Sequence, residues 1–157
     1  LGEFDLARAP DAAGKDLASL EKCLKEPRPV IVIAGDVLNP SVILLDGLLG
    51  ALEGFDAVVG PSFCGACYGV ALAAEGRERD AAARALARSL LGPAGSFAQG
   101  IKEVSQAGVE VFCQAPWYLA RDAGSRRFAL WHMKALLAAG DDEFIAHRTL
   151  AALEKEA

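Results

Sequence analysis

The run VIVIA, Val30–Ala34, is the feature that most restricts how this chain can fold. It is short, continuously apolar and rich in β-branched residues, which is typical of a strand buried on both faces. Similar runs follow at 56–60 and 109–113, and segments with helical spacing of apolar residues separate the three. Strands that alternate with helices indicate right-handed crossovers, so the pattern predicts a parallel sheet.

The chain is therefore expected to form one α/β domain over residues 1–157, with a small, mostly parallel sheet of three or four strands and helices on both faces. Residues 1–29 should form an N-terminal helical extension, and residues 124–157 a helical C-terminal segment. Asn39 is a candidate helix cap, and Pro40 suits the first turn of the helix after it. The predicted helices cover 16–26, 40–52, an alanine-rich stretch from the cysteine motif to about 91, 96–107, and two segments within 125–156.

Ligands bind at the carboxyl ends of the strands in sheets of this kind. The segments that follow the three predicted strands should therefore meet at one edge. Asp36 could bind a ligand hydroxyl or act as a base there, or it could only stabilise its turn. Trp117 could line a pocket or anchor the chain to the core. The candidate ligand-binding residues are Gly35, Asp36, Gln114 and Trp117, and Cys113 is a third candidate thiol.

The motif CGAC places Cys64 and Cys67 between an apolar run and an alanine-rich one. If a helix begins near Ala66, its unpaired N–H groups and its dipole would stabilise the thiolate of Cys64, and Cys67 could resolve a disulfide formed there. We therefore predict Cys64 and Cys67 as the catalytic pair. Two alternatives stay open: both could be small buried residues, or they could bind a metal. A zinc site needs four ligands, and only Cys113 and two histidines remain to complete one.

Composition excludes several classes of protein. The hydrophobic content of 53% and charged content of 24% are those of a globular domain. The net charge of −5 argues against non-specific binding to nucleic acid, and no apolar run reaches the roughly 20 residues that span a bilayer. Four cysteines are too few for a secreted disulfide scaffold, which favours the cytoplasm. No glycine-rich loop matches a nucleotide-cofactor motif, so no cofactor is expected.

The segment VIVIAGDVLNPSVILLDGLLGALEGFDAVVGPSFCGAC contains a strand, a Gly-Asp turn, a proline-started helix, a second strand and the cysteine pair. It resembles the opening of protein A of the glycine reductase complex, in which selenocysteine usually replaces the second cysteine. That resemblance implies that Cys67 carries the substrate group and that Cys64 closes a bond to it. The segments GVEVFCQAP and CGACYGV are similar to the cysteine loops of DsrE-like sulfur-relay proteins. This implies persulfide transfer between partners and often a homo-oligomer.

These observations predict a cytoplasmic thiol-redox or sulfur-transfer protein that exchanges electrons or sulfur with a protein partner. It would bind neither nucleic acid nor a membrane, and whether it is an enzyme stays open. One alternative is a non-catalytic module that binds a small ligand at the sheet edge, with cysteines that only pack. Another is a structural subunit of a larger complex.

Overall fold

The computed structural model describes residues 17–25, 28–38, 42–73, 78–92, 96–120 and 122–140, together with 147, 150, 151, 153 and 154. The predicted cap at Asn39 and the helix start at Pro40 lie outside these residues. So do most of the N-terminal extension and most of the second C-terminal helix.

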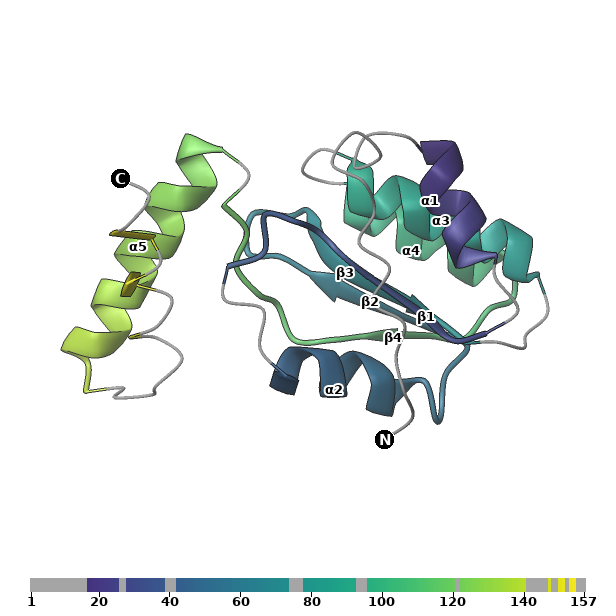
Figure 1. The fold of residues 1–157 in the computed structure, drawn as a ribbon, viewed down its shortest axis with the longest axis horizontal. Coiled ribbons are helices and arrows are strands. Elements are labelled where there is room, and N and C mark those ends of the chain that lie inside the picture. Colours follow the sequence, from purple (N-terminus) through teal and green to yellow (C-terminus); the bar gives the residue numbers. More distant parts are fainter. Residues whose placement is uncertain are drawn as a thin grey trace.

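Four strands form one mixed sheet in the described part of the chain (Figure 1): β1 (Val30–Ile33), β2 (Ala57–Pro61), β3 (Cys67–Leu72) and β4 (Val111–Cys113). Their order is β1-β3-β2-β4. β3 is antiparallel to both of its neighbours, whereas β2 and β4 are parallel. The three predicted strands, β1, β2 and β4, therefore point the same way. The prediction of a mostly parallel sheet is wrong, because β3 lies between β1 and β2.

β3 occupies a segment whose alanine-rich sequence predicts a helix. All of its residues are buried, so both faces are apolar and no alternation of polar and apolar residues marks a strand. The turn before it is closed by a hydrogen bond of 2.8 Å from the Ser62 N–H to the Ala66 carbonyl. Gly65 within this turn has a φ of 79°, a left-handed conformation that glycine adopts at little cost. β2 and β3 thus form a hairpin.

Five helices have both limits within the described residues: α1 (Leu17–Leu24), α2 (Val42–Ala51), α3 (Arg79–Leu91), α4 (Ser96–Gln106) and α5 (Ala123–Ala138). Figure 1 shows α1, α3 and α4 on one face of the sheet, α2 on the other, and α5 beyond one end of the strands. This confirms the prediction of helices on both faces. None of the described helices is long and apolar enough to cross a membrane.

The side chains of the strands alternate between two core clusters. Ala57 and Val59 of β2 pack in the cluster formed with α1, α3 and α4, and Val58 between them packs against α2. In β1, Val32 contacts the first cluster and Ile31 the second. A third, smaller cluster joins α5 to the end of the sheet through Leu38, Tyr118, Ala120, Ala129, Met133 and Leu153.

Candidate functional site

The two cysteines of the CGAC motif do not lie at a helix start, and they belong to different core clusters. No helix begins directly after them, because Cys67 opens β3, which continues to Leu72. Cys67 is fully buried in the cluster that faces α3 and α4, and its thiol donates to the Gly69 carbonyl at 3.1 Å. Cys64 is half-buried and packs on the α2 side, where its sulfur lies 3.0 Å from the Ser62 hydroxyl. Since the two sulfurs belong to opposite faces of the sheet, the expected catalytic pair at a helix start is wrong.

The other two cysteines, Cys23 and Cys113, lie outside the CGAC motif, and none of these four described cysteines forms a disulfide. Cys23 is exposed on α1. Cys113 is exposed at the end of β4, and partial burial of its sulfur raises the pKa of that thiol, which disfavours the nucleophilic thiolate.

The end of the sheet beyond the carboxyl ends of β1, β2 and β4 is closed by a ladder of three backbone segments. The central segment, 117–120, pairs in parallel with the end of β2 through Ser62 and Trp117, and antiparallel with 36–38 through Val37 and Leu119. The Ala120 N–H donates to the Asp36 carbonyl at 2.8 Å, and the Leu38 N–H donates to the Tyr118 carbonyl at 3.0 Å. These bonds fix the chain after β1 against the chain before α5.

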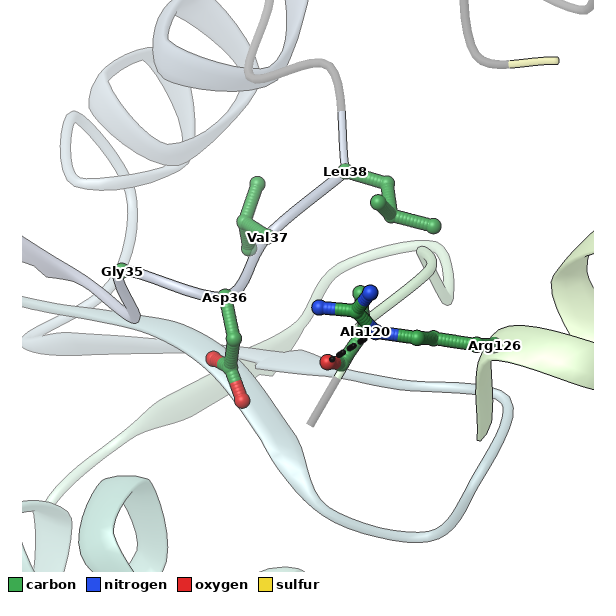
Figure 2. Close-up of a pocket in the computed structure, with 6 residues that line it drawn as sticks. All are labelled: Gly35, Asp36, Val37, Leu38, Ala120 and Arg126. Atoms are coloured by element: carbon green, nitrogen blue, oxygen red, sulfur yellow. Dashed lines mark hydrogen bonds between the residues drawn. The ribbon is translucent and has the colours of Figure 1, made fainter. Parts of the chain in front are cut away.

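A solvent-facing cleft of about 260 Å³ lies beside this ladder and is lined by Gly35, Asp36, Val37, Leu38, Ala120 and Arg126. Figure 2 shows Arg126 reaching from α5 toward the Gly35–Leu38 segment, from which the Asp36 carboxylate projects. The Arg126 Nε–H donates to the Ala120 carbonyl at 3.3 Å. A carboxylate and a guanidinium thus line one opening at the carboxyl end of β1.

The start of α5 explains why Arg126 reaches the cleft. Asp122 caps the helix: its carboxylate accepts a hydrogen bond of 2.7 Å from the Ser125 N–H, and the Ser125 hydroxyl accepts from the Asp122 N–H at 3.0 Å. This reciprocal capping box sets where the first turn begins. The Arg126 N–H then bonds to the Asp122 carbonyl at 3.0 Å, which places its side chain beside Ala120.

The sequence-derived ligand residues divide into two groups. Gly35 and Asp36 line the cleft. Gln114 instead lies over α2, where a Cβ atom on Gly47 would collide with its side-chain amide. Trp117 is half-buried and does not line the cleft. Its Nε1–H donates to the Leu38 carbonyl at 2.6 Å, so the indole fixes the position of one residue that does. Sequence reasoning missed Arg126, although Asp122 followed by Ser125 is a recognisable helix start.

Comparisons with known proteins identify the fold. No family model matches the chain, and no curated protein matches it. A solved structure from Desulfovibrio desulfuricans, provisionally named a nucleotide-diphospho-sugar transferase, is similar with a TM-score of 0.62 and 17% identity. The match covers 95% of this chain and 60% of that chain, so this chain spans less than two thirds of that protein's length.

This similarity corrects the family assignment. The fold neighbour is neither protein A of glycine reductase nor a DsrE-like sulfur-relay protein. Together with the separation of Cys64 from Cys67, it overturns the predicted thiol-redox or sulfur-transfer function.

Proposed function

We propose that this chain is a nucleotide-sugar-transferase-like domain that binds a nucleoside-diphospho-sugar in the cleft between Asp36 and Arg126. The observation that carries the proposal is this pair of charged side chains at the carboxyl end of β1, in a fold similar to that of a protein named for such a substrate. Open α/β sheets commonly bind ligands at this edge.

The two charged groups suit different parts of such a substrate. Arg126 offers the planar set of N–H donors that binds phosphate oxygens in pairs, and its Nε–H bond to Ala120 restricts the position of the guanidinium. Asp36 offers carboxylate oxygens that accept hydrogen bonds from sugar hydroxyls. Because a hydrogen-bonded backbone ladder holds both walls, little ordering is required when a ligand binds.

The proposal includes a cytoplasmic location, which remains the expectation drawn from the few cysteines. Homo-oligomer formation and the lack of nucleic-acid binding likewise remain predictions. Sedimentation velocity on the purified chain tests the first, and a gel-shift assay with duplex and single-stranded oligonucleotides tests the second.

Isothermal titration with UDP-glucose, GDP-mannose and dTDP-glucose tests the proposal directly. Each titration is run with and without Mg²⁺, because that ion often bridges one protein carboxylate and substrate phosphates. Free UDP and free glucose separate the contribution of the phosphates from that of the sugar. We expect at least one of the nucleotide sugars to bind.

Two substitutions then locate the binding. Arg126→Gln should raise the Kd about tenfold or more, since a hydrogen bond to a charged group contributes about 1.5–3 kcal/mol. Asp36→Asn should weaken the binding of the nucleotide sugar more than the binding of the free nucleotide. Arg127→Gln is the matched control, because this neighbouring arginine is exposed on the same helix and bonds to the Ala123 carbonyl instead. Equal losses in Arg126→Gln and Arg127→Gln, or binding of none of the three sugars, would refute the proposal.

A further inference from the structure

An exposed group of rings, here named the aromatic platform, lies where α5 meets the β2–β3 turn. It consists of Phe63, Phe128, Trp131 and His132. Phe63, Phe128 and Trp131 are 42%, 37% and 64% exposed, and they are three of the four large apolar side chains that are exposed in the described residues. The ring centres of Phe63 and Phe128 are 6.1 Å apart, and those of Phe128 and Trp131 are 5.9 Å apart.

His132 lies among these rings and connects them to a buried support. Its ring centre is 5.6 Å from those of both Phe63 and Phe128, and 6.0 Å from that of Trp131. Its Nδ1 is 2.6 Å from the hydroxyl of Tyr118, a buried residue whose ring centre is 4.7 Å from that of Phe63. The platform is thus held in place by contacts beneath it.

The packing of α5 does not require these rings at the surface. The residues that α5 buries are Ser125, Ala129 and Met133, which recur every four positions along one face. Phe128 and Trp131 lie off that face and remain exposed. A cluster of exposed aromatic side chains that the fold itself does not use is typical of a binding site.

The size of the platform indicates what binds there. Its exposed aromatic area is roughly 300 Å², if a whole aromatic side chain contributes 150–250 Å². A stable protein interface covers about 800 Å² on each partner. A patch of this size fits one or two small rings better than a protein surface.

We propose that the aromatic platform binds a ring of a neutral saccharide that serves as the acceptor, an inference that rests on the proposed function. A pyranose has apolar C–H faces that can pack on aromatic rings and hydroxyls around its edge. Because Nδ1 of His132 is engaged by Tyr118, Nε2 is the imidazole atom that can bond a hydroxyl. Asp36 and Phe63 lie on segments two strand spacings apart, about 10 Å. The ring that the platform binds is therefore one that lies away from the reacting end of the acceptor, because the sugar that is transferred is held at Asp36.

The test uses saturation-transfer NMR and titration calorimetry on the full chain with four trisaccharides: maltotriose, cellotriose, chitotriose and mannotriose. Trp131→Ala removes the most exposed ring and should leave the fold intact, which circular dichroism checks. Phe55→Ala is the matched control, since Phe55 is 38% exposed but packs against Phe112, away from the platform. Binding of UDP-glucose, GDP-mannose and dTDP-glucose is measured on the same variants.

We expect at least one trisaccharide to bind, with Trp131→Ala raising its Kd about tenfold or more and Phe55→Ala leaving it unchanged. Binding of the nucleotide sugars should not change in Trp131→Ala. If the wild-type chain binds a trisaccharide but none of the nucleotide sugars, only the proposed function is refuted. The platform inference is overturned if no trisaccharide binds at about 10 mM, if both substitutions weaken binding equally, or if Trp131→Ala dissociates an oligomer in sedimentation.

Discussion

Gly60 is a position at which the addition of one methyl group should destabilise this fold. It lies in β2 opposite Gly69 of β3, next to an irregularity in the strand register. There the ring of Tyr68 lies across the Gly60 backbone. A Cβ atom on Gly60 would meet three atoms of that ring, with Cε1 at 2.7 Å, well inside any normal carbon–carbon contact. Gly60→Ala therefore forces either the ring or the strand to move.

The loss of stability in Gly60→Ala can be derived from the surroundings of Tyr68. The residue is only 1% exposed and packs in one cluster with Val58 of β2 and Leu48 of α2, so its ring has no open space to enter. Overpacking of a closed core costs about 1–3 kcal/mol, and we expect about 2 kcal/mol for Gly60→Ala. For a domain of this length that lowers the Tm by about 4–8 °C. Urea denaturation followed by circular dichroism measures the free energy, and calorimetry measures the Tm.

A double-mutant cycle separates this mechanism from a general effect of alanine. Tyr68→Leu shortens the side chain over Gly60, so Gly60→Ala should cost less than about 1 kcal/mol in that background. Gly50→Ala is the control: a Cβ there meets nothing, and replacing a helical glycine should stabilise α2 by up to about 1 kcal/mol. If Gly60→Ala costs the same with Tyr68 and with leucine at that position, the close ring contact is not the cause and the reasoning fails.

Three further predictions follow from the described contacts. Burial raises the pKa of Tyr68 to about 12. In a pH titration, the absorbance of its phenolate should therefore appear at a higher pH than that of an exposed tyrosine. Because the folded pKa exceeds the unfolded value of 10.0, the stabilisation linked to Tyr68 is complete below pH 10.0 and is lost as pH rises toward about 12; a free energy of unfolding that is constant over this range would contradict it. Asp122→Ala removes the cap of α5 and should cost about 1 kcal/mol, whereas Asp122→Asn should cost far less in the same denaturation assay. Iodoacetamide should label Cys67 only as fast as the chain unfolds, whereas the exposed thiols of Cys23 and Cys113 should react in the folded state, as peptide mass spectrometry can show.

The parts of the fold that the sequence predicted are those with a strong local signal. Three short apolar runs bounded by turns became β1, β2 and β4, and the helical segments near them formed close to their expected limits. β3 was missed because a fully buried strand lacks periodicity and its sequence runs into the alanine-rich start of α3. The sign of a hairpin that the sequence offered was a glycine, Gly65, between two apolar runs. In the structure this glycine has the left-handed conformation of a tight turn.

The residues of the candidate site likewise divide into those with a local sequence signal and those without one. The position of Asp36 could be predicted because it lies in the turn after a predicted strand, and the carboxyl ends of strands in α/β sheets are where ligands bind. Arg126 could not, because its position depends on the pairing of Val37 with Leu119, which joins segments far apart in the chain. Sequence patterns report local conformation, whereas a cleft built from two distant segments depends on tertiary pairing.

The Ser62–Ala66 turn shows how one error in topology changes a functional interpretation. With a helix after it, the turn would present Cys64 to solvent at a helix N-terminus. With β3 after it, the turn closes a hairpin, Cys64 packs toward α2, and the Phe63 N–H bonds to the Trp117 carbonyl at 3.0 Å. That bond aligns the turn with segment 117–120, so the Phe63 ring packs on Tyr118 beside α5. Whether a strand or a helix follows the turn therefore decides whether these residues favour sulfur chemistry or form a surface on which rings can stack.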